Sequence, residues 1–337
     1  MRYNKGRSGA KTRRIQEGKM PAQYTHQIYA ETLLSLLPEE ERARISDLPA
    51  YYLGAQGGDV FYFLRLVTPG GGNLGKYLHN TDVYGFFSEM LASLRRGGSS
   101  AALSYAAGYV THYALDTVFH PFVYGTTEKL IAAHPKSRIR WHAYIESDID
   151  SHFIRKLRGI SVTDYVSPLR ISELDVPALY AFLSGVFDAR GRRHFSLFLF
   201  RRALRRYFLF ERAFTDRTLR RRRMLHAAES ALHCQRAFSS LCRRTGIDEN
   251  CLNTEREEWR NPSDPSFVSH ESADDLFSRA LAEGERLTGL FFAALGGAPL
   301  PEADFSKGFL SGVDCSLPHV RPGKTGRHPC KPSASRV

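Results

Sequence analysis

Hydrophobic residues recur along most of the chain at intervals of three and four, the spacing of one face of a helix. No convincing run of alternating hydrophobic and polar residues, which would predict a strand, is present, and no internal repeat is found. The pattern therefore predicts an all-α protein with a single multi-helix domain. Helices are expected at 21–37, 74–96, 101–120, 138–158, 176–188, 192–214, 217–243 and 274–295.

Basic, polar segments flank this domain. Residues 1–19 are expected to form a disordered extension, and residues 301–337, rich in Pro, Ser, Lys and Arg, a flexible basic tail. The helical domain itself spans 20–300. Its first part, 20–158, holds the candidate functional residues, and 159–300 is the helical remainder.

The segment 108–124, GYVTHYALDTVFHPFVY, has the most distinctive polar pattern. His112, Asp116 and His120 are spaced four residues apart within an apolar run. Each such step turns a helical side chain by only about 40°, so the three project from one face. Pro121 is expected to end or kink the helix directly after His120.

A second segment repeats this spacing. His142 and Glu146 lie one turn apart in WHAYIESDID, and Asp150 shares their face. Asp148, Asp150 and His152 are interpreted as a solvated face, with support of the neighbouring polar residues as the alternative. His142 and Glu146 are the pair that we expect to be functional.

Three further residues become candidates in this context. His26 lies in the first turn of the first helix, with Thr25 as the expected N-cap. Asp59 follows the glycine-rich turn Gly54–Gly58, which can aim its carboxylate into a cavity. His79 lies one turn into the next helix. Each alone would be read as a capping, turn or surface residue.

An imidazole and a carboxylate one helical turn apart have the bite needed to hold a divalent cation. Nitrogen and oxygen ligands without thiolate favour Zn²⁺. Two or more ions generate hydroxide near neutral pH and clamp both oxygens of a phosphoryl displacement. Without an ion, so many buried polar groups would be costly. The candidate zinc ligands are His26, Asp59, His79, His112, Asp116, His120, His142 and Glu146.

The net charge of +12 is concentrated away from these residues. Residues 1–19 carry +6, residues 190–223 carry +11 and residues 306–337 carry +5, which leaves −10 for the rest of the chain. The region of the predicted metal site is therefore acidic. This distribution weakens nucleic acid as the explanation of the basic composition.

The basic segment contains an amphipathic helical pattern. Arg201, Arg202, Arg205 and Arg206 alternate with aromatic and aliphatic residues. Three interpretations are open: a core helix whose arginines face water, a helix that contacts an anionic membrane, and a site for a phosphate backbone. The first is favoured.

The cysteines lie in the last third of the chain and form no C-x-x-C pair, so reduced thiols are expected rather than disulfides or a zinc finger. No apolar run approaches the roughly 20 residues needed to cross a bilayer. The basic N-terminus lacks the apolar core of a signal peptide. A cytoplasmic protein is expected. The cysteines are Cys234, Cys242, Cys251, Cys315 and Cys330.

Five short motifs follow one another between about residues 20 and 150. They are PAQYTHQIYAE, YYLGAQGGDVFYF, LGKYLHNTD, GYVTHYALDTVFHPF and HAYIESDID. This ordered set resembles the zinc-dependent phospholipase C family, with a weaker similarity at 259–262 and 274–277. The resemblance implies an all-helical fold around a three-zinc cluster, shared with the fungal single-strand-specific nucleases.

The resemblance also implies how the ligands are distributed. One zinc would be held by Asp59, His79, His112 and Asp116, a second by His120, His142 and Glu146, and a third by His26 with Asp116 bridging. Asp59 would be the general base or would orient the attacking water. Secreted bacterial members complete the third site with an N-terminal tryptophan. Here 25 residues without tryptophan precede His26, so that site depends on whether the chain starts at Met1 or Met20, or is processed.

The sequence thus predicts a zinc-dependent phosphoester hydrolase of phospholipase C type, in which metal-activated water attacks phosphorus. A phospholipid or another phosphoester would be the substrate. One alternative is a nuclease of the same fold, which the basic segments favour. Another is a non-catalytic protein that binds a membrane or a partner and keeps zinc as a structural staple.

Overall fold

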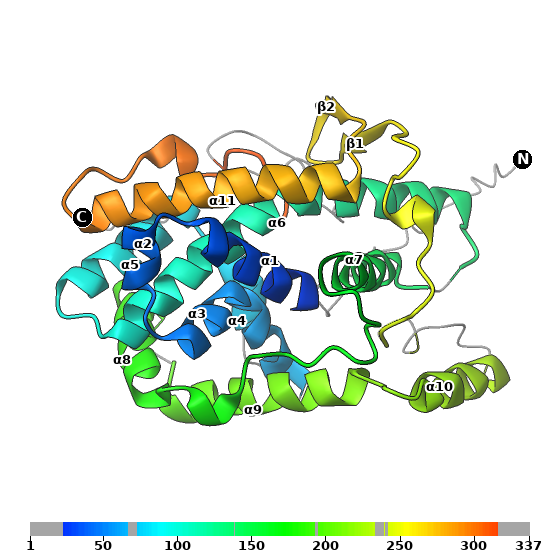
Figure 1. The fold of residues 1–337 in the computed structure, drawn as a ribbon, viewed down its shortest axis with the longest axis horizontal. Coiled ribbons are helices and arrows are strands. Elements are labelled where there is room, and N and C mark those ends of the chain that lie inside the picture. Colours follow the sequence, from blue (N-terminus) through cyan, green and yellow to red (C-terminus); the bar gives the residue numbers. More distant parts are fainter. Residues whose placement is uncertain are drawn as a thin grey trace, which may run out of the picture.

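The computed structural model describes residues 23–66, 73–137, 139–192, 195–232, 239 and 242–315. This part of the chain is mostly helical, which confirms the all-α prediction (Figure 1). The α-helices are α1 (Gln23–Leu36), α2 (Glu39–Arg44), α3 (Leu48–Ala55), α4 (Leu74–Leu78), α5 (Val83–Arg95), α6 (Ser100–Ala133), α7 (Trp141–Arg158), α8 (Val176–Ala189), α9 (Leu197–Phe214), α10 (Arg220–Ala231) and α11 (Ala273–Leu295). The 3₁₀ helices are η1 (Gly57–Leu66), η2 (Ile171–Glu173), η4 (Glu249–Cys251) and η5 (Glu302–Asp304), and the strands are β1 (Trp259–Asn261) and β2 (Asp264–Ser269).

The long helix α6 organises the fold because it is buried along most of its length. Its residues are apolar or small nearly all round, which is the pattern of a helix enclosed by other elements. It packs chiefly against α3 and α11. A Cβ at Gly108 would collide with the backbone oxygen of Tyr51 in α3. Glycine at this position therefore allows the two helices to approach closely.

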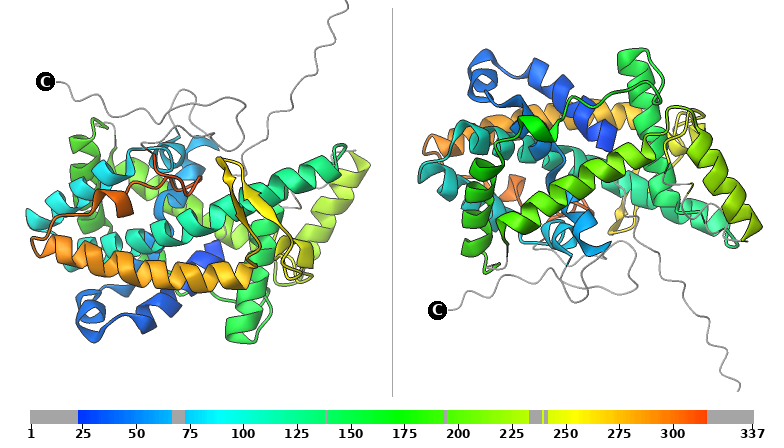
Figure 2. Two further views of the ribbon diagram at one scale, coloured as in Figure 1. Left: turned by 90° about the horizontal axis from the view of Figure 1, so that it is seen from above. Right: turned by 90° about the horizontal axis from the view of Figure 1, so that it is seen from below.

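One hydrophobic core joins the two parts of the predicted domain. It contains Tyr29 and Phe61 from the first part and Phe187, Phe200 and Phe291 from the second. In Figure 1, α11 lies along one side of the molecule, and α9 and α10 lie along the opposite side. Figure 2 shows the molecule from above, with α11 in front, and from below, with α9 in front. The residues at 159–300 therefore share a core with the metal-site part.

Two helix predictions need correction. The chain does not leave the helix at Pro121, because α6 continues to Ala133. Buried Phe122 and Val123 pack in the core beyond the proline, and this packing outweighs the proline's missing N–H. The predicted helix 74–96 is divided into α4 and α5, because Asp82 caps α5 by accepting a hydrogen bond from the backbone N–H of Gly85 (3.0 Å).

The strands β1 and β2 form an antiparallel hairpin that the sequence did not predict. Their pairing is irregular between Arg260 and Asn261, and they are too short to show a period-2 pattern. None of the described helices combines the length and apolar character needed to span a membrane.

The first residues of the predicted C-terminal tail pack against the domain. Phe305 and Phe309 are buried, and Phe305 contacts Phe87 of α5 with ring centroids 4.9 Å apart. A flexible tail was expected because Pro, Ser, Lys and Arg are frequent at 301–337, but two buried aromatic residues hold its first part against the domain. Residues 316–337 of the tail and the predicted extension at 1–19 lie outside the described residues.

Candidate metal centre

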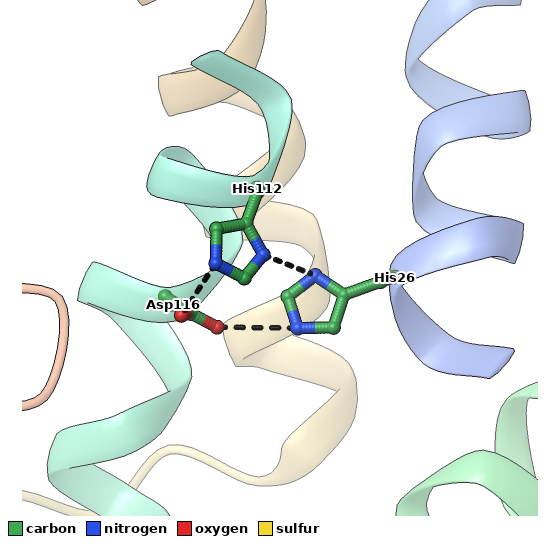
Figure 3. Close-up of side chains that lie close together, drawn as sticks. All are labelled: His26, His112 and Asp116. Carbon is green, nitrogen blue, oxygen red and sulfur yellow. Dashed lines mark hydrogen bonds and ion pairs between the residues drawn. The ribbon is translucent and has the colours of Figure 1, made fainter. Parts of the chain in front are cut away.

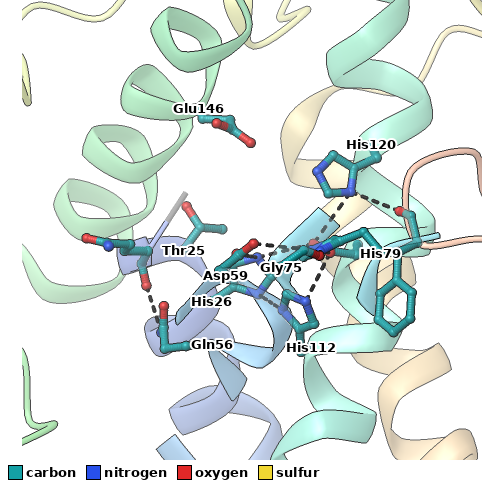
Figure 4. Close-up of polar contacts among 12 residues, drawn as sticks. Thr25, His26, Gln56, Asp59, Gly75, His79, His112, His120 and Glu146 are labelled. Carbon is teal, nitrogen blue, oxygen red and sulfur yellow. Dashed lines mark hydrogen bonds and ion pairs between the residues drawn. The ribbon is translucent and has the colours of Figure 1, made fainter. Parts of the chain in front are cut away.

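The eight predicted ligands come together inside the molecule. They form three groups, within each of which one ligand atom per residue lies within 4.8 Å of the others. They come from α1, η1, the end of α4, α6 and α7 (Figure 4). The groups are His26, His112 and Asp116; Asp59, His79 and His112; and His120, His142 and Glu146.

Asp116 of α6 lies between these groups. Its Oδ1 is 3.2 Å from Nε2 of His26, and its Oδ2 is 3.2 Å from Nε2 of His112 (Figure 3). His79 Nε2 lies 3.7 Å from Oδ2, and His120 Nδ1 lies 3.6 Å from Oδ1. One carboxylate therefore contacts histidines from three separate segments, as expected for a bridging ligand.

Asp59 is positioned by the turn that joins α3 to η1. Gly57 has φ of +51°, and a Cβ there would collide with the imidazole of His112. Both facts restrict this position to glycine. The turn aims Asp59 inward, with Oδ1 3.2 Å from Nε2 of His79 and Oδ2 3.9 Å from Nε2 of His26.

His79 is the C-cap residue of α4. Its Nδ1 lies 2.7 Å from the carbonyl oxygen of Gly75, so Nδ1 donates and Nε2 faces the carboxylates. Burial lowers the pKa of His79, but the hydrogen bond that His79 donates to Asp59 and the charge of that carboxylate outweigh burial and raise it to about 9. Nε2 therefore carries a proton at neutral pH that a bound cation would replace.

His26 lies in the first turn of α1, as predicted, but Thr25 is not the N-cap because the helix begins at Gln23. The N–H and Oγ1 of Thr25 both donate to Oδ1 of Asp150, each at 2.7 Å. Asp150 Oδ2 is in turn 3.1 Å from Nη2 of Arg243. This buried chain of contacts ties the first turn of α1 to α7.

The third group joins the middle of α6 to the first turns of α7. His142 Nε2 lies 3.0 Å from Oε1 of Glu146. His120 Nδ1 donates to the carbonyl oxygen of Phe309 (2.9 Å), which leaves Nε2 as its ligand atom. Tyr124 packs on His142 with ring centroids 4.7 Å apart. The side chains of His120 and His142 are 12% and 11% exposed, so solvent reaches the cluster at this edge.

Several ligand atoms are buried without a hydrogen-bond partner. They include His112 Nε2, Asp116 Oδ2 and Glu146 Oε2. His112 Nε2 and Asp116 Oδ2 are 3.2 Å apart, yet no hydrogen bond joins them. Buried polar atoms are rarely left in this state unless an ion or water satisfies them. The residues therefore fit a cation, and imidazole with carboxylate is a donor set that suits zinc.

The protonation states in the cluster also suit metal binding. Burial raises the pKa of Asp116, but the surrounding imidazoles, including the hydrogen bond from His26, outweigh it and hold that pKa well below its usual range. Burial lowers the pKa of His112 to about 4. Asp116 is therefore anionic and His112 neutral at neutral pH, the forms in which each binds a metal.

Sequence reasoning missed the contribution of Phe309. Its ring packs against the imidazoles of His79 and His112, each with centroids 5.6 Å apart, and its carbonyl orients His120. No periodic pattern surrounds it, so the only signal was an aromatic residue within a Gly- and Ser-rich stretch.

The interpretation of Asp148 and Asp150 as solvent-facing is wrong, because both are fully buried. Arg244 donates to Asp148 through Nε (3.0 Å), and Arg243 pairs with Asp150. His152 is partly exposed and pairs with Asp274 (2.8 Å). The two arginines lie far along the chain, at the end of the predicted helix 217–243, so the sequence alone did not indicate these partners.

The family model described as zinc dependent phospholipase C matches residues 25–185. Over this segment the chain is similar to that family. This segment contains all eight ligands of the candidate metal centre. Comparisons with curated proteins and with solved structures gave no significant match. The phospholipase C segment ends inside α8, so α9, α10 and α11 lie beyond it.

Proposed function

We propose that this protein is a zinc-dependent phosphoester hydrolase of phospholipase C type, with a phospholipid or a related phosphoester as substrate. The observation that carries the proposal is the convergence of three groups of ligand atoms, each within 4.8 Å, in a segment that is similar to that family. This similarity supports hydrolase chemistry, and the buried donor set supports zinc as the cofactor.

The proposed distribution of ligands follows the three groups. Two or three zinc ions would be held by Asp59, His79, His112 and Asp116; by His120, His142 and Glu146; and by His26 with Asp116 bridging. Zinc bound there supplies a water ionised near neutral pH and charge stabilisation for phosphoryl oxygens.

The protein's own residues orient and protect this chemistry. The carbonyl oxygens of Gly75 and Phe309 fix the imidazoles of His79 and His120 with Nε2 toward the site. The carboxylate of Asp59 has one oxygen 3.2 Å from His79 and the other 3.9 Å from His26. Its second oxygen can therefore accept a proton while the first keeps the group oriented, which suits a general base.

Zinc analysis of the purified protein tests the cofactor. We expect two or three zinc ions per chain, and the loss of at least one in His112→Ala. His226→Ala, on the exposed face of α10, is the matched control and should retain the full amount. Less than one zinc per chain in the wild type, unchanged in His112→Ala, would refute the zinc site.

Hydrolysis assays test the reaction. Asp59→Asn should lower turnover of phosphatidylcholine by about 10²- to 10⁴-fold, the range for a general base. A nuclease is the second candidate because the segment 190–223 is strongly basic. Cleavage of single-stranded DNA without cleavage of phosphatidylcholine would select it. If chelation unfolds the protein and no substrate is turned over, the zinc has a structural role instead.

Contact with an anionic membrane is the remaining part of the proposal. Arg201 and Arg205 are exposed on α9, whereas Arg202 and Arg206 are partly buried. Arg206 Nη1 donates to the carbonyl oxygen of Leu64 (3.0 Å) and so helps to fix α9 over η1. Of the four predicted arginines, Arg201 and Arg205 are therefore suited to meet lipid. The cytoplasmic location stays a prediction.

A further inference from the structure

The outer face of α9 mixes apolar and basic side chains. Phe198, Arg201, Arg205, Leu209 and Arg212 are exposed and spaced by three or four residues, so they form one stripe along the helix. Phe198 and Leu209 are 69% and 64% exposed. A helix that merely covers a core presents polar residues outward. This stripe instead has the composition of a helix that lies at a lipid surface.

The next helix, α10, also exposes apolar residues. Figure 2, in the view from below, shows α9 in front and α10 beyond its end. Met224 of α10 is 71% exposed and Leu232 is 72% exposed. The helix opens with four arginines, Arg220–Arg223, at the end where the helix dipole is positive. The positive charges of these arginines and the positive end of the helix dipole repel one another, so an anion bound between them would be stabilised.

A groove of about 790 Å³ lies between the loop at 165–170 and the junction of α9 with α10. Part of its wall is apolar or aromatic and includes Tyr165, Leu169 and Phe208. Tyr165 is 5% exposed, and its hydroxyl has no hydrogen-bond partner. A buried hydroxyl without a partner thus lies in the wall of the groove.

Arginines surround this groove. Arg212, Arg217 and Arg220 line the groove. Among the residues that the structure describes, no carboxylate forms an ion pair with any of these three guanidinium groups. Arg170 and Arg221 also line the groove. Unpaired guanidinium groups around a concave surface form a receptor for a phosphate or carboxylate.

Two acidic residues, Asp216 and Glu211, also line the groove and offset part of this charge. Asp216 accepts hydrogen bonds from the backbone N–H groups of Thr218 (3.3 Å) and Arg222 (3.0 Å), so it is occupied at the start of α10. Burial raises the pKa of Glu211 to about 6, against the opposing effects of Ser167 and Arg243.

We propose that this groove binds the headgroup of an anionic phospholipid, while the stripe of α9 and Met224 of α10 enter the lipid surface. A membrane fits better than nucleic acid because the exposed apolar residues are mainly aliphatic. Single-stranded nucleic acid needs a series of outward aromatic platforms, whereas Phe198 is the one exposed aromatic residue of α9, and Phe200 and Tyr207 are buried. The groove is separate from the metal ligands, so docking does not require turnover.

Vesicle co-sedimentation tests the proposal on the full-length, zinc-loaded protein. Binding to phosphatidylcholine vesicles should strengthen when phosphatidylserine is included. The triple variant Arg212→Gln, Arg217→Gln, Arg220→Gln should weaken binding to the mixed vesicles by about a hundredfold. Tyr165→Phe should weaken it by a few-fold, because only the hydroxyl is lost. Both variants should hydrolyse a soluble short-chain phosphodiester at the same rate as the wild type and should have the same melting temperature.

The control variant Arg256→Gln, Arg260→Gln, Arg279→Gln removes the same charge from exposed positions around β1 and α11. It should bind mixed vesicles nearly as well as the wild type. An equal loss in this control would show general attraction rather than a site. Unchanged binding in the groove triple or in Tyr165→Phe, or preference for single-stranded DNA over vesicles, would also overturn the proposal. A protein that hydrolyses the soluble substrate but does not bind vesicles would contradict the docking site and leave the proposed enzyme function intact.

Discussion

At the scale of single residues, the candidate metal centre depends most on Asp116. Its two oxygens are each 3.2 Å from a different imidazole, those of His26 and His112. The surrounding histidines hold its pKa well below the usual range for Asp, so it stays anionic even at low pH. The carboxylate also lies 3.7 Å from His79 and 3.6 Å from His120, so it can serve two ions at once, whereas Glu146 lies beside His142.

This difference predicts unequal effects of two similar changes. Asp116→Asn should remove zinc from two positions, because the amide has lost the charge that both would share. Glu146→Gln should remove zinc from one position. Zinc stoichiometry and the hydrolysis rate measure both effects. Equal zinc contents in the two variants would contradict the bridging role of Asp116.

Glu211 gives a pH-dependent prediction. Burial raises its pKa from 4.5 to about 6, so folding favours the protonated form. This destabilisation is absent below about pH 4.5 and complete above pH 6. Glu211→Gln should therefore unfold at higher urea than the wild type at pH 7, by about 1–2 kcal/mol. Near pH 4.5 the two should be equally stable. An equal increase in unfolding free energy at both pH values would exclude the titration of Glu211 as the cause.

At the scale of elements, close packing of α3 against α6 places the ligands of both segments together. A Cβ at Gly108 would strike the backbone of α3, which cannot move without displacing the turn that carries Asp59. Gly108→Ala should therefore cost about 2–3 kcal/mol of unfolding free energy. Gly246→Ala, where a Cβ meets nothing within 4 Å, is the control. Equal urea midpoints for the two variants would contradict this reading.

Local patterns predicted the elements that contain ligands. The candidate ligands on α6 and α7 could be predicted from the sequence, because four-residue spacing alone determines which side chains share a helix face. The continuation of α6 beyond Pro121 was not visible, because buried contacts of Phe122 outweigh the local preference of proline. The roles of Phe309 and Arg243 depend on contacts across long stretches of sequence. Spacing carries no information about such contacts.

At the scale of the whole molecule, a single core encloses a cluster of charged and polar side chains. Burying such groups costs free energy that a bound cation offsets. Zinc removal by a chelator should therefore lower the melting temperature. Free zinc at about 1,000 times its Kd should stabilise the fold by about 4 kcal/mol. His120→Ala should reduce this gain and His226→Ala should not. A melting temperature that is unchanged by the chelator would contradict the prediction.

The contact between His120 and the carbonyl of Phe309 has a consequence for how the protein is made. The ligands lie between His26 and Glu146, but the group that fixes the tautomer of His120 arrives only when residue 309 has been synthesised. The N-terminal part of a growing chain begins to fold first. The earlier ligands can therefore assemble during translation, whereas the His120 group is completed last. A nascent chain that ends before residue 309 should capture its first zinc before it can bind the full set.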